Sequence, residues 1–94
     1  MINLENKTSL TLEECEELMN ENNGQLILDR SYITELPKNL VVPGNLILTR
    51  SLIRKLPKGL VVKGNLVIGF TNIGELPEDI IVNGSICITY SYII

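Results

Sequence analysis

Aliphatic and polar positions repeat along most of this chain with a fixed period of twenty residues. Three full copies begin at glycines, and they read GQLILDRSYITELPKNLVVP, GNLILTRSLIRKLPKGLVVK and GNLVIGFTNIGELPEDIIVN. A partial fourth copy reads GSICITYSYII. A period of this length, matched in several columns at once, indicates a repeat architecture. The chain therefore divides into an N-terminal segment and a repeat region, with boundaries 1–23, 24–43, 44–63, 64–83 and 84–94.

Within each copy, aliphatic residues occupy alternate positions directly after the glycine, which is the pattern of a strand with one buried face. In the first copy the inward positions are Leu26 and Leu28, and further aliphatic columns begin at Ile33, Leu40 and Val42. One copy cannot bury these side chains alone, but stacked copies can, with neighbouring strands about 4.8 Å apart. We therefore expect a mostly β fold, a right-handed solenoid of about 3.5 twenty-residue coils that is closed at its N-terminus by a helix.

Small and polar residues mark the bends between strands. The glycines that open the copies, of which Gly24 is the first, stand where a bend needs positive φ or a close backbone approach. The Leu-Pro pairs, such as Leu36 and Pro37, mark a turn at which the chain gives up a backbone donor. A column of hydroxyl residues is expected to bond the backbone at another turn, and it consists of Ser31, Ser51, Thr71 and Ser91.

The N-terminal segment predicts one amphipathic helix that covers the first coil. Thr11 followed by Glu14 forms a capping-box signature, and Asn22, Asn23 and Gly24 are typical of a helix end. The expected buried face consists of Leu12, Cys15, Leu18 and Met19. A repeat stack needs such a cap, because its open end would otherwise expose strand edges and core.

The repeat motif, written LPxxLxVxGxLxLxxSxIxx, resembles that of short leucine-rich-repeat-like β-solenoid proteins of bacteria and their phages. Its L-x-L-x-x-S-x-I part is similar to the strand segment of twenty-residue bacterial leucine-rich repeats, with Ser or Thr in place of Asn. A flatter β-solenoid is therefore the alternative to a horseshoe. The resemblance covers residues 24–94, and for function it implies binding to other proteins.

One column of apolar side chains lies between the inward strand positions and is therefore expected to face outward. It consists of Ile27, Ile47, Val67 and Cys87, and a second outward column consists of Val41, Val61 and Ile81. Together these side chains would form an exposed patch of a few hundred Å2, which favours a protein-binding surface. Two alternatives remain open: β-branched residues favour strands wherever they lie, and residues 2–10 could fold over the patch.

A row of large side chains runs beside the first of these columns, and it consists of Arg30, Arg50, Phe70 and Tyr90. Stacked arginine and aromatic residues offer cation–π contacts and resemble the composition of interface hot spots. Further positive charge lies at Arg54, Lys55, Lys58 and Lys63. We therefore consider an acidic protein segment as a partner, including the acidic helix of another copy; the alternative is scattered solubilising charge.

Charge is divided unevenly between the two parts of the chain. The net charge is −3, and the N-terminal segment contributes six Glu against one Lys. The remaining residues carry seven cations against five carboxylates, which is too weak a positive balance for a nucleic-acid surface. The helix positions Glu13, Glu16 and Glu17 suggest a second function, a phage-encoded inhibitor of a host nuclease or defence complex (anti-CRISPR-like), in which carboxylates imitate phosphates. The alternative is a solvated helix face.

The residue types and motifs of common active sites are missing from the sequence. The chain contains no His, and no GxGxxG, GxxxxGK[ST] or CxxC motif is present. The acidic turn at Glu75, Glu78 and Asp79 is interpreted as solvated rather than as a cation site. We therefore expect a non-enzymatic protein that uses neither a cofactor nor a metal.

The cysteines and the N-terminus predict the compartment. The two cysteines, Cys15 and Cys87, are too few for a disulfide framework, which favours free thiols in a reducing compartment. Neither a signal peptide nor an apolar run long enough to span a membrane is found in the sequence. We expect a cytoplasmic protein of a bacterial host cell that binds neither a membrane nor nucleic acid directly.

The partial repeat 84–94 lacks a cap comparable with the N-terminal helix. We therefore expect its strand edge to be exposed and to pair with the same edge of a second copy about a two-fold axis. The residues expected at this dimer interface are Tyr90, Tyr92, Ile93 and Ile94. A monomer shielded by its own tyrosines is the alternative. The resulting hypothesis for function is a protein-binding or scaffolding module that forms a homodimer.

Overall fold

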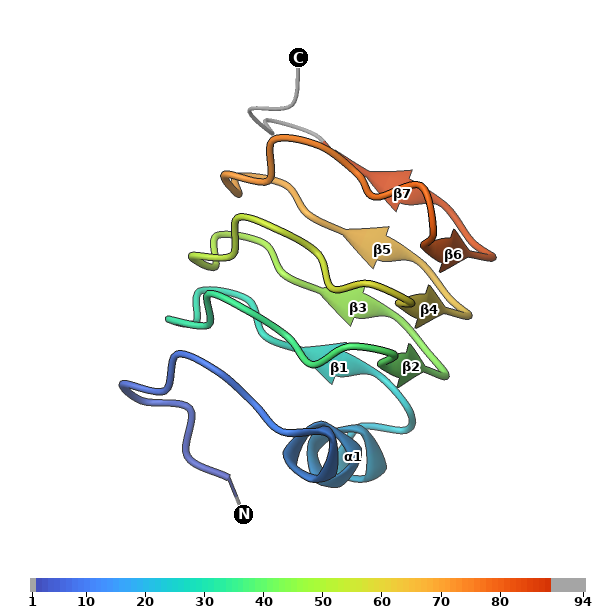
Figure 1. Cartoon of the computed structure of the whole chain (residues 1–94). Helices are drawn as coiled ribbons and strands as arrows, with labels where there is room; N and C mark the ends of the chain where they lie inside the picture. The colour runs from blue at the N-terminus through green and yellow to red at the C-terminus, as the bar shows by residue number, and fades with distance from the viewer. Residues whose placement is uncertain (1, 89–94) are drawn as a thin grey trace.

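The computed structural model describes residues 2–88 and consists of one N-terminal helix followed by short parallel strands in two sheets (Figure 1). Helix α1 spans Leu12–Glu21. Strands β1, β3, β5 and β7 form a four-stranded sheet in that order, with bounds Leu26–Ile27, Leu46–Ile47, Leu66–Val67 and Ile86–Cys87. Strands β2, β4 and β6 form a three-stranded sheet in that order, with bounds Val41–Val42, Val61–Val62 and Ile81–Val82. A mostly β architecture with one N-terminal helix is thus confirmed.

The register of both sheets equals the twenty-residue sequence period. Leu26 pairs with Leu46, so one column of the sequence becomes one row across the sheet. The backbone donors run in opposite senses in the two sheets. The N–H of Leu26 donates to the carbonyl of Asn45 in the next repeat at 2.9 Å, whereas the N–H of Val61 donates to Leu40 in the preceding repeat at 2.9 Å. Each repeat is therefore tied to the next by two separate sets of parallel-strand hydrogen bonds.

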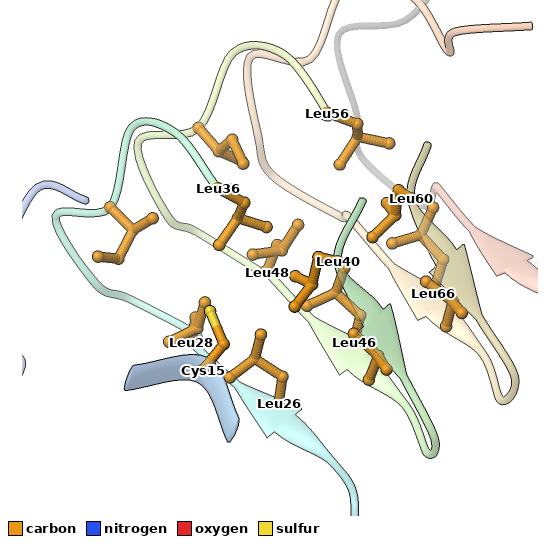
Figure 2. Close-up of a cluster of buried hydrophobic side chains, with 14 of the residues drawn as sticks. Cys15, Leu26, Leu28, Leu36, Leu40, Leu46, Leu48, Leu56, Leu60 and Leu66 are labelled. Carbon is orange, nitrogen blue, oxygen red and sulfur yellow. The ribbon is translucent and has the colours of Figure 1, made fainter. Parts of the chain in front are cut away.

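The two sheets enclose a single hydrophobic core. Strands β2 and β3 run in opposite directions on either side of a bend over residues 43–45, and both send alternate side chains inward (Figure 1). Figure 2 shows leucines packed between the two sheets, among them Leu46 of β3 and also Leu40 and Leu60, which directly precede β2 and β4. The fully buried aliphatic residues recur at the same positions of successive repeats, and they are Leu26, Leu28, Ile33, Leu40, Val42, Leu46, Leu48, Ile53, Leu60, Val62, Leu66, Ile68 and Ile73. These are the aliphatic columns of the sequence, so each repeat covers the core of its neighbour.

Two different constraints explain the glycines that open the repeats. Gly24, which follows the helix C-cap Asn22 by two residues, has a positive φ of 87°, which Gly adopts without steric cost. At Gly64 the constraint is space, because a Cβ atom would collide with the side chain of Asn45 and would lie 2.7 Å from the carbonyl oxygen of Gly44. The repeats are therefore packed backbone against backbone at this bend.

Helix α1 lies against the first repeat at the N-terminal end of the stack (Figure 1). The capping box is present: the Thr11 hydroxyl accepts from the Glu14 N–H at 3.1 Å, and the Glu14 carboxylate accepts from the Thr11 N–H at 3.0 Å. A salt bridge of 2.9 Å joins Glu14 to Lys7. None of the helical structure within residues 2–88 is long and apolar enough to cross a membrane.

The buried face of α1 differs from the expected one at a single position. Cys15, Leu18 and Met19 are buried, but Leu12 is exposed, so its assignment to the core was wrong. Leu12 is the first residue of the helix and lies at the margin of the apolar face. The core position at this end is taken by Leu10, which precedes the helix and is buried.

The last described repeat is less covered than the others. Ile86 and Ile88 stand in inward columns, yet they are 40% and 44% exposed. Strand β7 has β5 on one side, and within residues 2–88 no strand follows it on the other. The exposure of Ile86 and Ile88 therefore comes from their position at the end of the described stack rather than from a different backbone conformation. The four residues expected at a dimer interface, Tyr90, Tyr92, Ile93 and Ile94, lie outside the described residues.

Candidate functional site

The outward face of the four-stranded sheet carries one apolar side chain per strand. These residues, which we call the outward stripe, are Ile27, Ile47, Val67 and Cys87. The parallel register sets each of them directly beside the next, so they form a continuous row across four strands. Ile27 and Cys87 are exposed, while Ile47 and Val67 are half-buried between their neighbours in the row. No charged or amide side chain interrupts the row.

The segment that precedes the helix does not cover this stripe. The carbonyl of Thr8 accepts from the N–H of Thr34 at 2.8 Å, and Ser9 pairs in parallel with Glu35. The segment 2–10 therefore lies against residues 34–35, which follow β1 in the first repeat, and its Ile2 and Leu4 pack against the core. Ile27, at the nearest end of the stripe, stays exposed. Folding of this segment over the stripe, one of the two alternatives, is therefore contradicted by the structure.

The second outward column is a separate surface. Val41, Val61 and Ile81 belong to the three-stranded sheet, on the other side of the core from the outward stripe. Because β2 and β3 run in opposite directions around the bend and share one core, their outward side chains point away from each other. The single patch of seven side chains expected from the sequence is thus wrong: the structure divides it into two narrower stripes.

Beside the outward stripe, the arginine and aromatic row forms the expected contact. The guanidinium of Arg50 lies over the ring of Phe70, 4.3 Å from the ring centroid. Arg30, Arg50 and Phe70 are all exposed. Tyr90, the fourth member of the row, lies outside the described residues. The described part of the row therefore combines two positive charges with one aromatic face.

An amide ladder that the sequence reasoning missed fixes the bend between the two sheets. The Asn45 side-chain oxygen accepts from the Asn65 N–H at 2.7 Å, and the Asn65 side-chain oxygen accepts from the Ser85 N–H at 2.9 Å. The Asn45 side-chain amide also donates to the Gln25 side chain at 3.0 Å. The available signal was the column Gln25, Asn45 and Asn65, one position after each glycine. These amides serve the fold, because their oxygens satisfy backbone donors.

The buried hydroxyl column also serves the backbone. The Thr71 hydroxyl donates to the carbonyl of Ile68 at 2.7 Å, and the Ser31 hydroxyl accepts from the N–H of Ile33 at 3.4 Å. The Ser51 hydroxyl is buried without a hydrogen-bond partner among the described residues. The bonds of Ser31 and Thr71 are those expected from the sequence, and they place these hydroxyls inside turns rather than in an accessible site. The bond expected of Ser51 is not formed, and Ser91 lies outside the described residues.

The two cysteines have different environments. Cys15 is fully buried under the first repeat, and burial, followed by the nearby charges of Glu14 and Glu16, raises the pKa of its thiol to about 11. Cys87 is exposed at the end of the outward stripe. Both are free thiols. Cys15 is therefore a core residue, and only Cys87 can contact a partner.

The acidic positions of α1 are accessible. Glu13, Glu16 and Glu17 are all exposed, whereas the opposite face of the helix carries buried Cys15 and Leu18. The structure therefore presents these three carboxylates at the N-terminal end of the stack, away from the outward stripe of the later repeats.

The remaining charged residues show no assembled ion site. Arg54, Lys55, Lys58 and Lys63 are exposed on the second repeat. The Asp79 carboxylate of the acidic turn accepts from the Gly59 N–H at 3.1 Å. Within residues 2–88, no three His, Cys, Asp or Glu side chains are grouped as a metal site would require.

Comparison with known proteins gives no match to this chain among protein-family models, curated proteins or solved structures.

Proposed function

We propose that this chain is a non-enzymatic protein-binding or scaffolding module that acts through the outward stripe. In this proposal the two parallel sheets are walls of a right-handed solenoid of twenty-residue coils, similar to the short leucine-rich-repeat-like proteins of bacteria and phages. We further propose that it works in the bacterial cytoplasm, without a cofactor. The supporting observation is the continuous apolar row of Ile27, Ile47, Val67 and Cys87 across four strands.

The area of the stripe limits what it can do alone. Its partly exposed side chains offer on the order of 200 Å2 of apolar surface, which at about 25 cal/mol per Å2 corresponds to about 5 kcal/mol. Association costs at least about 4 kcal/mol in lost translational and rotational freedom. The stripe therefore supports a weak contact by itself, and a stable complex needs further contacts beside it.

The proposal is tested by replacing Ile47 with Lys, in the centre of the stripe. Ile47→Lys is expected to abolish capture of the partner from a lysate of the source organism while the circular dichroism spectrum stays unchanged. The matched control is Val41→Lys, which places the same charge on the outward face of the other sheet. Equal capture by both variants and the unchanged protein would contradict the proposal, and unfolding of Ile47→Lys would show that this side chain belongs to the core.

We also propose that two copies associate through the C-terminal repeat. The exposure of Ile86 and Ile88 supports this part. The expected contacts include Tyr90, Tyr92, Ile93 and Ile94. Light scattering at tens of micromolar should give the mass of a dimer, and a monomer at that concentration would refute the association.

A second candidate function uses the acidic helix. The exposure of Glu13, Glu16 and Glu17 at one end of the stack favours an inhibitor that occupies a basic site of a host nuclease or defence complex. Reversing these three charges to Lys should destroy inhibition while α1 and the sheets remain folded. Unchanged inhibition by the reversed variant would dismiss this candidate.

A further inference from the structure

Three large side chains occupy backbone positions that normally select small residues. Arg30, Arg50 and Phe70 have φ of 58°, 60° and 58°. This left-handed region favours Gly, tolerates Asn and Asp, and is strained for bulky residues. The same strained position recurs in three successive repeats, so it is a feature of the repeat and not of one local sequence.

The backbone explains the positive φ but not the side chains. The Ser31 N–H bonds to the carbonyl of Leu28 at 3.3 Å, which closes a tight turn with Arg30 as its third residue. The N–H of Arg30 also donates to Thr49 of the next repeat at 2.8 Å, and that of Arg50 donates to Gly69 at 3.2 Å. A β-turn with positive φ at its third residue normally carries Gly or Asn there. Glycine would satisfy every one of these backbone bonds.

A second column of the same chain shows the ordinary choice. Asn39 and Gly59, at equivalent positions of the first and second repeats, have φ of 61° and 71°. There the chain uses the two residue types that this conformation favours. The arginines and the phenylalanine thus occupy a backbone conformation that favours Gly, and such outliers point to function.

The strained column forms part of a larger exposed surface. Phe70, in the strained column itself, is 41% exposed. Two residues beyond the strained position in the first and second repeats, Tyr32 is 54% exposed and Leu52 is 47% exposed. We call this set the turn ridge, and its members are Arg30, Tyr32, Arg50, Leu52 and Phe70. Successive turns are separated by one strand spacing, about 4.8 Å, because hydrogen bonds between the backbones of neighbouring repeats continue through the turns. Tyr, Arg and Phe together are the composition of energetic centres in protein interfaces.

The charge of the ridge selects the kind of partner. In the second repeat, residues 49–55 contain Arg50, Arg54 and Lys55 and no carboxylate. Carboxylates occur on either side, at Asp29 and Glu35 in the first repeat and at Glu75 in the third. The positive charge is therefore centred on the middle repeat, between exposed apolar side chains. Guanidinium groups in this setting pair with carboxylates in bidentate geometry.

We propose that the turn ridge recognises an acidic segment of a partner protein, with carboxylates on Arg30 and Arg50 and apolar side chains against Tyr32, Leu52 and Phe70. This inference rests on the proposed protein-binding function and names the chemistry of its partner. Arg30, Arg50 and Phe70 follow the outward stripe by three residues in their repeats, so one partner can cover both surfaces. It supplies the additional contacts that the narrow stripe requires.

The first test measures binding of a fluorescein-labelled synthetic peptide of repeated Glu-Glu-Leu triplets by fluorescence anisotropy. Replacing both Arg30 and Arg50 with Gly should weaken binding of this peptide at least tenfold, which is about the effect of losing one or two charge-assisted hydrogen bonds. A matched peptide with Gln in place of Glu should bind the unchanged protein as weakly. Undiminished binding to the double Gly variant, no binding of the Glu peptide to the unchanged protein, or tighter binding of an oligouridine than of the Glu peptide would overturn the inference.

A second readout separates recognition from folding. The double Gly variant should melt within about 4 °C of the unchanged protein or above it, because Gly relieves the strained φ at both positions. A larger fall would show that the arginines serve the fold, which would overturn the inference. Capture of the partner from a lysate separates this inference from the proposed function. If Ile47→Lys loses capture but the double Gly variant does not, only the role of the turn ridge is refuted. If neither variant loses capture, both the turn ridge and the proposed function are refuted.

Discussion

Replacing Gly64 with Ala tests the close packing between repeats. Gly64 does not have positive φ, so the substitution adds no backbone strain of its own. The new Cβ atom would collide with the side chain of Asn45 and would lie 2.7 Å from the carbonyl oxygen and 2.8 Å from the carbonyl carbon of Gly44. Backbone atoms cannot swing aside as a flexible side chain can. Either the second and third repeats must separate, or Asn45 must leave the N–H of Asn65 that it accepts at 2.7 Å.

The expected loss of stability follows from these contacts. Overpacking a close contact costs about 1–3 kcal/mol. Losing the hydrogen bond of the Asn65 N–H costs about 1 kcal/mol more. Replacing Gly by Ala returns about 0.4–1 kcal/mol, because the unfolded chain has fewer conformations to lose. The free energy of unfolding should therefore fall by about 1–3 kcal/mol, which corresponds to a fall in Tm of about 5–20 °C for a chain of this size.

The chain supplies a matched control in Gly74. A Cβ atom there would meet nothing within 4 Å, and Gly74 also lacks positive φ. Gly74→Ala should therefore leave Tm unchanged or raise it, because only the gain from the unfolded state remains. Thermal and urea unfolding followed by circular dichroism measure both variants. Equal effects of Gly64→Ala and Gly74→Ala would refute the close packing of the repeats.

Four further predictions concern the core, the cap and the thiols. Leu46→Ala should lower the free energy of unfolding by about 2–5 kcal/mol in urea titrations, because Leu46 is fully buried between two repeats; a loss below 1 kcal/mol would contradict its place in the core. Thr11→Ala should cost about 0.5–2 kcal/mol through loss of the capping box, and an unchanged urea midpoint would show that the cap is not needed. A thiol reagent at neutral pH should modify Cys87 in the folded protein and leave Cys15 intact until unfolding, since burial raises the pKa of Cys15 from 9.0 to about 11; modification of Cys15 at the same rate would refute its burial. Because the unfolded thiol ionises first, stability should fall as the pH rises through 9 towards 11, and a flat stability profile in that range would contradict this shift.

The strand register was predictable because paired residues of neighbouring strands are separated by one sequence period. Residues that occupy one column twenty positions apart, such as Leu26 and Leu46, pair in the sheet. The start of the helix was also predictable, since the capping box of Thr11 and Glu14 is a local signal within four residues. In both cases the information lies in sequence spacing alone.

Features that depend on the angle between elements were not predictable in the same way. The alternation correctly places Ile47 and Val61 outside the core, but it contains no information on the bend that turns their sheets apart. The amide ladder through Asn45 and Asn65 depends on the distance between stacked repeats. The row of Arg30, Arg50 and Phe70 was predictable from the sequence, but no glycine marks the positive φ at Arg50, so the backbone strain in this row is known only from the structure.

The central claim is that aliphatic columns of successive repeats stack into one shared core. Methyl–methyl nuclear Overhauser effects between Leu26 and Leu46, and between Leu46 and Leu66, test this claim most directly, because these pairs are neighbours only if the repeats stack in register. We predict strong cross-peaks for both pairs. Cross-peaks confined to residues of the same repeat, with none between residues twenty positions apart, would contradict the stacked architecture and every inference drawn from it.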